Sequence, residues 1–254
     1  MSETSFHFRQ FTIIQDKCAM KVGTDAVLLG SWTQTKNAER ILDIGTGSGI
    51  IALMLAQKCN ADIDGIDIDE KAFQQAQENF SISPWFNRLN CIHQSFQDFT
   101  KYSTSKYDLI VTNPPYFHHA SKPLAESRTN ARHSEVLAFD ELVFGVKNLL
   151  NPNGRFFVIF PSKEGMEFLH KAQRNALFCH HILRVKTKAD RIEKRMIMEF
   201  GFQFKTIMDE EIIIQDETGS FTNEYIELTK EYYLNLRQSQ SACQQNLSPT
   251  TSTP

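Results

Sequence analysis

From residue 40 onward, short apolar runs alternate with longer stretches in which apolar residues recur every three or four positions. The short runs are typical of buried strands, and the longer stretches are typical of helices with one buried face. Strands and helices that alternate at this spacing predict a sheet of parallel strands with helices on both faces. The elements predicted in this half are strands at 41–44, 63–66, 90–92 and 107–112 and helices at 49–58 and 70–80.

The second half continues the pattern but ends differently. A helix is predicted at 134–150, closed by the turn residues NPNG, and a strongly β-prone strand follows and ends at Pro161. Two further strands, at 178–187 and 195–204, have only a polar loop between them, which predicts an antiparallel pair at the sheet edge. We therefore expect an α/β, Rossmann-like fold with a seven-stranded, mostly parallel sheet.

The two ends of the chain stand outside this alternation. Residues 6–15 alternate apolar and polar positions and predict a short strand pair, and the helix that follows has Thr24 or Asp25 as its expected N-cap. A last helix is predicted at 221–236, ahead of a tail rich in Ser, Thr and Gln. The expected divisions are a lead-in at 1–38, a main domain at 39–237 and a disordered tail at 238–254.

Composition narrows the class of protein. The chain has 254 residues, 41% hydrophobic and 22% charged, which fits one large globular domain with small additions. Its apolar runs are far shorter than the ~20 residues that cross a bilayer, and its polar start lacks a signal peptide's apolar region. Five cysteines without a CxxC pair argue against disulfides and zinc and favour the cytoplasm. A net charge of −3 excludes a globally basic nucleic-acid binder, so any RNA contact needs a local patch.

The string LDIGTGSGI carries the first chemical signal. It places Asp43, Gly45, Gly47 and Gly49 where a buried strand passes into a helix, and glycines there let the backbone approach a ligand closely. Two ligands use such a loop. From Gly47 the segment satisfies the G-x-G-x-x-A pattern of NAD-binding loops, whereas the full D-x-G-x-G-x-G pattern is typical of S-adenosylmethionine loops and favours the methyl donor. A tight turn that only serves helix packing is the remaining alternative.

Asp67 ends the next predicted strand, at the distance expected for an acid that binds a ribose. Its carboxylate is placed to accept both ribose hydroxyls at the carboxyl edge of the sheet. The alternative is that Asp67 caps the helix beginning at Glu70, a role for which Asp69 competes. We assign Asp67 to the ribose.

The segment YDLIVTNPPYF is the most informative stretch. A strand runs into Asn113-Pro114-Pro115-Tyr116, where two prolines stiffen the backbone and remove donors. The Asn113 side-chain oxygen and the Pro114 carbonyl can each accept one N–H of a planar amine, which favours a pyramidal nitrogen and stabilises its developing positive charge. Tyr116 is expected to stack on the base or amide. The alternative is a helix-stopping Pro-Pro loop with a core tyrosine.

With these residues together, the chain resembles the class I S-adenosylmethionine-dependent methyltransferases of the amino-methylating (N/D)PP(Y/F) group. The blocks KCAMKVGTDAVLLGSW, LDIGTGSG, AQEN, SPW, NPPY and ARH are similar to the bacterial tRNA1(Val) adenine-37 N6-methyltransferase family over residues 6–236. The lead-in block narrows the family, because NPPY alone is shared with DNA adenine, ribosomal guanine and release-factor glutamine methyltransferases. The resemblance implies S-adenosylmethionine as cofactor, a valine tRNA as partner, and methyl transfer to N6 of adenine 37.

Rival functions remain open on the residues alone. A glutamine amide of a protein, or another RNA or DNA amine, presents a planar NH2 to the same two acceptors. A non-catalytic RNA-binding module would use the basic loops alone, and an NAD-dependent oxidoreductase would use the glycine loop. The chain also departs from its relatives: many carry an Asp that binds the cofactor adenine after the third strand, where this chain has Ser95. We keep Ser95 as a cofactor-binding residue, but a serine accepts only weakly, so either packing of Phe96 and a backbone carbonyl hold the adenine or Asp98 substitutes. We do not assign Asp98.

Basic residues supply the candidate RNA contacts. The loop after NPPY carries Arg128, Arg132 and His133 close to the expected target pocket. Lys21 is assigned to the cofactor and is also, with Arg9, a candidate for the RNA surface.

The stretch 184–195 holds six basic and two acidic residues, and it is either a phosphate-binding segment or a solvated edge-strand loop. Two pairs of neighbouring histidines occur, at 118–119 and 180–181. Neighbouring residues of a strand point to opposite faces, so the two histidines of a pair cannot bind one metal ion and no metal site is expected. No membrane contact and no obligate protein partner are inferred, and the sequence does not predict an oligomeric state.

Overall fold

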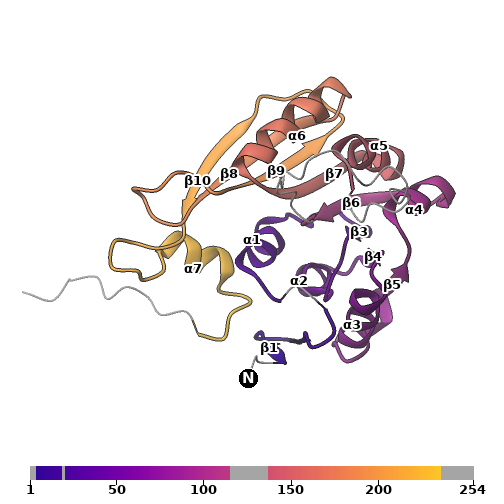
Figure 1. Ribbon diagram of the computed structural model, residues 1–254, viewed down its shortest axis with the longest axis horizontal. Coiled ribbons are helices and arrows are strands. Elements are labelled where there is room, and N and C mark those ends of the chain that lie inside the picture. Colours follow the sequence, from indigo (N-terminus) through magenta and orange to yellow (C-terminus); the bar gives the residue numbers. More distant parts are fainter. Residues whose placement is uncertain (1–3, 19–20, 115–136, 236–254) are drawn as a thin grey trace, which may run out of the picture.

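The chain is built around one large mixed sheet. The computed structural model describes residues 4–18, 21–114 and 137–235. The strands of the large sheet are β3 (Arg40–Ile44), β4 (Asp62–Asp67), β5 (Leu89–His93), β6 (Tyr107–Thr112), β7 (Leu150–Pro161), β8 (Phe178–Lys186), β9 (Arg195–Gly201) and β10 (Met208–Ile213). They lie in the order β10-β8-β9-β7-β6-β3-β4-β5 (Figure 1).

The predicted fold class is confirmed, with a correction at one edge. Strands β5, β4, β3, β6 and β7 run parallel, and β9 is antiparallel to both β7 and β8. The sheet has eight strands rather than seven, because β10 adds in parallel to β8 beyond the antiparallel segment. The predicted antiparallel pair is therefore present, but it does not form the edge.

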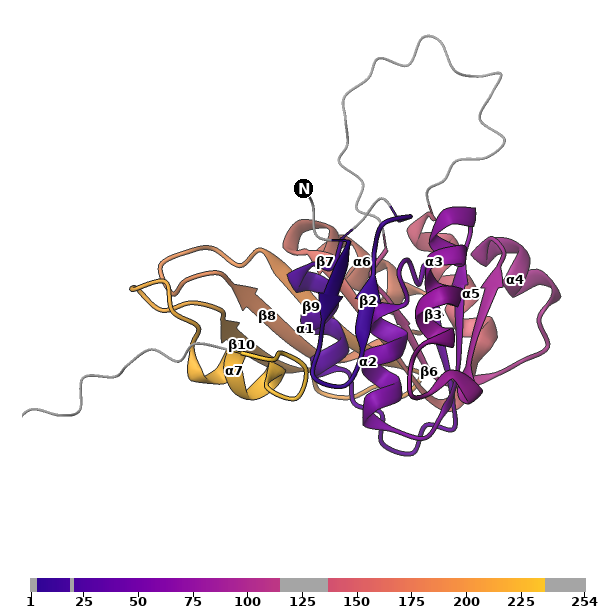
Figure 2. The same ribbon diagram turned by 90° about the horizontal axis from the view of Figure 1, so that it is seen from below.

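Helices cover both faces of the sheet, as predicted. Residues of one strand alternate between two cores: Ile41 faces the first and Leu42 the second, as the two-residue period of a strand requires. Figure 2 shows α2, α7 and the N-terminal strands on one side of the sheet. The first core is covered by α1 (Thr24–Trp32), α2 (Ile50–Lys58), α3 (Glu70–Ser81) and α7 (Asn223–Thr229), and the second by α4 (Phe96–Tyr102), α5 (Phe139–Leu149) and α6 (Ser162–Arg174).

The N-terminal strand pair is confirmed as β1 (Ser5–His7) and β2 (Thr12–Ile14), paired antiparallel. The apolar residues Phe8, Phe11 and Ile13 belong to the same core as α1 and α2. The lead-in therefore packs onto the main sheet through that shared core. Within the described residues, no helix is long and apolar enough to span a membrane.

Several local predictions need correction. The N-cap of α1 is Gly23, without a side-chain hydrogen bond, rather than Thr24 or Asp25. Asp25 instead forms an ion pair with Arg195 of β9, 2.7 Å apart, so its carboxylate serves a tertiary contact. The NPNG segment is not a turn between elements. It lies inside β7. Leu150 pairs with Tyr107 of β6 and Arg155 pairs with Leu109, so β7 has extra residues between these pairs and they form a bulge.

Helix boundaries also differ from the prediction. Helix α5 begins at Phe139, whereas residues 134–136 of the predicted helix lie outside the described part of the chain. Helix α7 is much shorter than the predicted 221–236, since it ends at Thr229. Helices α4 and α6 were not predicted from the sequence. The predicted disordered tail at 238–254 lies outside the described residues.

Candidate functional site

The register of the parallel strands brings the predicted site residues to one edge of the sheet. Ile44 of β3 pairs with both Thr112 of β6 and Ile66 of β4, so Gly45 lies between Asn113 and Asp67. The chain order reverses at β3, since β4 and β5 follow on one side and β6 and β7 lie on the other. Such a switch point at the carboxyl ends of strands is where open α/β sheets bind ligands.

The glycine loop has the backbone that the sequence predicts. Gly45 and Gly47 have φ angles of 68° and 59°, in the left-handed region that favours glycine. A Cβ at Gly45 would meet no atom within 4 Å, and at Gly47 only a carbonyl oxygen at 4.0 Å, so both border open space. Gly49 differs, because a Cβ there would lie 2.5 Å from the Phe80 ring. The first two glycines leave room for a ligand, whereas Gly49 is required by packing.

Asp43 is fully buried at the end of β3. One carboxylate oxygen, Oδ2, accepts hydrogen bonds from Thr46 Oγ1 at 2.7 Å and from the Ala52 amide at 3.2 Å. The other, Oδ1, is buried without a hydrogen-bond partner in the described structure. Burial raises the pKa of Asp43 to about 7, against the lowering effect of its two hydrogen bonds. A buried carboxylate with one oxygen unsatisfied is suited to a cationic partner such as an ammonium group.

Asp67 is the last residue of β4 and is linked to the glycine loop. Its Oδ2 accepts from the Gly47 amide at 2.8 Å and its Oδ1 from the Asp69 amide at 2.9 Å. Burial raises the pKa of Asp67 above its ordinary value, and these amide donors oppose the rise. Asp69, not Asp67, is the N-cap of α3 and accepts from the Ala72 amide at 2.8 Å. The capping alternative for Asp67 is therefore wrong.

Ser95 has a role that the sequence reading missed. It is the N-cap of α4, and its Oγ accepts from the Asp98 amide at 3.1 Å and donates to Asp98 Oδ2 at 2.9 Å. The spacing S-x-x-D is a signal for such a cap, so it was visible in the sequence. The hydroxyl proton of Ser95 is committed to Asp98, which leaves the serine oxygen only limited capacity to accept from a ligand.

Side-chain amides hold the lead-in against α3 and the glycine loop. Asn79, fully buried, accepts from the Ile14 amide at 2.9 Å and donates to the Ile14 and Ser48 carbonyls, each at 2.8 Å. Gln75, one turn earlier and equally buried, accepts from the Lys17 amide at 2.9 Å. Ile14 is the last residue of β2 and Lys17 lies in the irregular segment after it, so these amides satisfy backbone groups at the end of the strand and beyond it. Sequence reasoning did not identify either residue.

Lys21 is exposed and donates to the Gln15 carbonyl. Burial is the main cause that raises the pKa of the Cys18 thiol, and the charges of Lys21 and Asp67 act on that thiol in opposite directions. Cys18 therefore lies within electrostatic reach of both.

Asn113 and Pro114 follow β6 directly; Asn113 is half-buried and Pro114 is buried. Thr112, the last residue of β6, donates from Oγ1 to the Ile44 carbonyl at 2.8 Å and fastens this strand end to β3. Four further predicted residues of the target and RNA sites lie outside the described residues: Tyr116, Arg128, Arg132 and His133.

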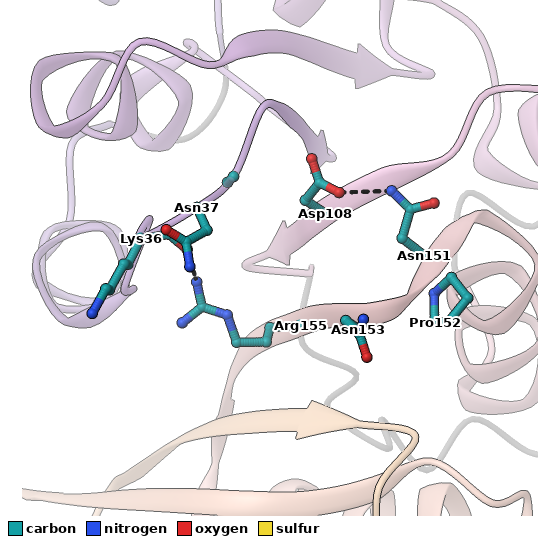
Figure 3. A pocket seen from close by; sticks show the side chains of 8 residues that line it. Lys36, Asn37, Asp108, Asn151, Pro152, Asn153 and Arg155 are labelled. Carbon is teal, nitrogen blue, oxygen red and sulfur yellow. Dashed lines mark hydrogen bonds between the residues drawn. The ribbon is translucent and has the colours of Figure 1, made fainter.

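One hollow in the described part of the chain lies away from these residues. A cavity of about 630 Å³ opens at the opposite edge of the sheet, between the start of β3 and the bulge of β7 (Figure 3). Its Asp108 accepts from Asn151 at 2.7 Å and from the amides of Glu39 and Arg40, so the carboxylate is used to hold strand starts together. These contacts explain this acid structurally, and we place the functional site at the carboxyl edge.

Metal chemistry finds no support in the described residues. No three His, Cys, Asp or Glu side chains among them gather where they could hold an ion. The cysteines at 18, 59, 91 and 179 are free thiols. His118 and His119 lie outside the described part.

Three features define the class of protein as an S-adenosylmethionine-dependent methyltransferase. They are the doubly wound sheet, the D-x-G-x-G-x-G loop at its switch point and the acid at the end of the next strand. Residues 18–181 match the family described as "Methyltransferase small domain". The chain belongs to the tRNA1(Val) (adenine(37)-N6)-methyltransferase family. It is 44% identical over 237 residues to the enzyme of that name from Bacteroides fragilis strain YCH46, covering 93% of this chain and 100% of the relative.

Two further comparisons agree. The enzyme of the same name from Phocaeicola vulgatus is 43% identical over 236 residues, with 93% of this chain and 100% of the relative covered. A crystal structure described as a predicted O-methyltransferase from Agrobacterium tumefaciens superposes with a TM-score of 0.65 at 15% identity, covering 82% of this chain and 96% of that one. At that identity the structural likeness supports the fold alone.

Proposed function

We propose that this protein transfers a methyl group from S-adenosylmethionine to N6 of adenine 37 in a valine tRNA. The observation that carries the proposal is the position of Asn113 and Pro114, which follow β6 immediately beside the glycine loop of β3. The family membership supports the choice of substrate, because the relatives are named for this nucleotide. Free thiols and a tRNA substrate are both compatible with the cytoplasm.

The residues of the glycine loop fit the methyl donor. Gly45 and Gly47 border open space, and the unpartnered Oδ1 of Asp43 is suited to accept, directly or through water, from the donor's ammonium group. Asp67 would accept from the ribose hydroxyls, and Lys21, whose charge acts on the same Cys18 thiol as that of Asp67, is also proposed to contact the donor. When bound, S-adenosylmethionine supplies an electrophilic methyl group on a sulfonium sulfur.

Asn113 and Pro114 act on the acceptor nitrogen. The side-chain oxygen of Asn113 and the carbonyl oxygen of Pro114 would each accept a hydrogen bond from N6–H. These two bonds would hold the amine with its lone pair directed at the methyl group. As N6 gained the methyl group, the bond between that carbon and the sulfonium sulfur would break and S-adenosylhomocysteine would leave. N6 would become positively charged, and the two oxygens would stabilise this charge until one N–H proton was lost to water. Tyr116 is proposed to stack on the extruded base, and Arg128, Arg132 and His133 to bind RNA around it.

The adenine end of the donor site needs a revised proposal. Ser95 remains the residue at the position where many relatives have Asp, but its hydroxyl proton goes to Asp98. We therefore propose that Ser95 contributes through its backbone and its lone pairs, and that the exposed side chain of Ile68, next to Asp67, packs on the adenine ring.

Mass spectrometry of nucleosides tests the function. Purified protein is incubated with S-adenosylmethionine and with tRNA from cells that lack this enzyme. We expect N6-methyladenosine at position 37 of the valine tRNA and at no other adenine. Asn113→Ala should lower the rate about 10²- to 10³-fold while donor binding persists, because one oxyanion-type contact is lost.

The rival functions give different results in the same experiment. Tritium from labelled donor that enters protein instead of RNA would indicate a glutamine methyltransferase. A non-catalytic RNA-binding module would bind the tRNA equally well with Asn113 or with Ala at that position. Donor binding by the wild-type protein with no label in either acceptor would overturn the proposed function.

A further inference from the structure

The basic stretch 184–195 divides into two groups once its partners are known. Three of its cations are neutralised by acidic side chains, and these contacts join β8 to β10 and β9 to α1. Arg184 pairs with Glu193 at 2.8 Å and with Asp209 at 2.7 Å, Lys186 with Glu211 at 2.8 Å, and Arg195 with Asp25 at 2.7 Å. This group is structural.

The second group lies in the loop 187–194, which we call the β8–β9 connection. Lys188, Arg191 and Lys194 line a hollow of about 440 Å³ together with Thr187 and Ile192. The Ile192 side chain is 84% exposed, which is unusual for an isoleucine in a loop of cations. Lys188 and Arg191 belong to a turn closed by the bond from the Arg191 amide to the Lys188 carbonyl, at 3.1 Å.

These cations have no strong acidic partner among the described residues. The acid nearest to Arg191 is its sequence neighbour Asp190, 3.7 Å away, and both side chains are largely exposed. Lys188 donates to the Glu217 carbonyl at 3.3 Å, a contact that leaves its charge uncompensated. An exposed ion pair with this separation contributes little to stability. The β8–β9 connection therefore carries a local positive charge.

The β8–β9 connection opens at the same sheet edge as the proposed site. Val185 pairs with Arg195 and Arg195 with Pro161, so the loop 187–194 lies at the carboxyl ends of β7 and β8. The Ser162 amide donates to the Lys194 carbonyl at 3.3 Å and fastens the connection to the end of β7. With strands about 4.8 Å apart, β9 and β8 lie roughly 10–15 Å from the end of β6.

We propose that the β8–β9 connection is a second contact surface for the RNA substrate. Lys188, Arg191 and Lys194 bind backbone phosphates beside the loop that holds the target adenine, and Ile192 packs on a ribose or an unstacked base. The proposal rests on the proposed function for the identity of the RNA. It adds a surface, in the described part of the chain, that holds RNA two to three strands away from the reacting nucleotide.

Salt dependence of RNA binding tests the cations. In the triple variant Lys188→Gln, Arg191→Gln and Lys194→Gln, tRNA affinity at low salt should fall roughly ten- to hundredfold. The slope of log K against log salt should flatten by about 2, because each lost phosphate contact is worth about 0.7 to 0.9 in slope. Donor affinity by calorimetry and the rate at saturating tRNA should be unchanged.

A matched variant separates local contact from net charge. Lys36→Gln, Lys106→Gln and Arg155→Gln remove the same charge at the opposite edge of the sheet, where Lys36 and Arg155 line the cavity of Figure 3. This control should change the salt slope by much less than the first triple variant. Ile192→Ser should weaken tRNA binding severalfold without changing the slope, since it removes apolar contact and no charge.

The outcomes distinguish this proposal from the proposed function. Thermal unfolding of each variant confirms that it folds. If the wild-type protein methylates tRNA while the first triple variant binds tRNA with wild-type affinity and slope, the contact surface is refuted and the function stands. Equal losses in both triple variants also refute it, because the effect then comes from net charge. If the wild-type protein neither binds nor methylates tRNA, the proposed function itself fails.

Discussion

Asn79 links three segments that must come together at the methyl-donor site, so its replacement should affect stability and donor binding together. The side chain is fully buried and holds the Ile14 amide, the Ile14 carbonyl and the Ser48 carbonyl, at 2.9, 2.8 and 2.8 Å. In Asn79→Leu, which keeps the branching of the side chain, all three groups lose their partner. A buried group left unsatisfied costs about 1–3 kcal/mol, and Ser48 is buried whereas Ile14 is half-buried. We expect the free energy of unfolding to fall by about 3 kcal/mol.

The effect on the donor follows from Ser48, which belongs to the glycine loop. Without the Asn79 bond, the Ser48 carbonyl is free to turn, and the loop has to be ordered by the donor itself. If ordering the loop costs about 1.4 kcal/mol of binding free energy, the dissociation constant of the donor rises tenfold. Isothermal calorimetry measures this constant directly. Urea unfolding of the same preparations gives the stability.

Gln75→Leu is the matched control for this prediction. Gln75 lies one turn away on α3, is equally buried, and holds the lead-in at Lys17 without touching the glycine loop. It should lose about 1–2 kcal/mol of stability with donor affinity close to that of the wild type. If Asn79→Leu and Gln75→Leu show the same donor affinity, the inferred link between Asn79 and the glycine loop is refuted, whatever the loss of stability.

Three further predictions follow from single contacts. Gly49→Ala should destabilise the fold by about 1–3 kcal/mol in urea unfolding, because φ is 80° there and the new Cβ would lie 2.5 Å from the Phe80 ring. Donor affinity should fall as the pH drops below about 7, because Asp43 then takes up a proton and no longer attracts an ammonium group; calorimetry of Asp43→Asn should show weaker, pH-independent binding. Arg184→Gln should accelerate amide exchange in β10 more than elsewhere, since it leaves Asp209 without its bidentate partner; uniform exchange across the sheet would contradict this.

The parts of the fold that the sequence predicted are those decided by local chemistry. Strand β3 is a short buried run followed by glycines, and β6 is a β-branched run stopped by prolines, so both strand and boundary are visible in a few residues. The glycine loop was also predictable from a few neighbouring residues. Its φ angles of 59–80° are ones that other residues rarely adopt, so the glycines themselves mark the turn.

Strand β10 shows why the rest was not predictable. Its first four residues, Met208 to Glu211, are exposed, and three of them are acidic, which is the opposite of a strand signal. What holds them is β8, with Arg184 on Asp209 and Lys186 on Glu211. These partners are about 25 residues apart in sequence, so the stabilising contact is invisible until both strands are placed. Asn79 is a similar case, because its partners are 65 and 31 residues away.

The arrangement around Asp67 explains how an acid can serve both the protein and a ligand. A carboxylate has about four lone-pair positions; the Gly47 and Asp69 amides use one on each oxygen of Asp67, and the Ile68 backbone adds a further contact. The capacity that remains is available to the hydroxyls of a ribose. The amide bonds favour the charged form and oppose the rise in pKa that burial causes. Asp67 is thus oriented by the glycine loop before the donor arrives, so binding need not break either bond.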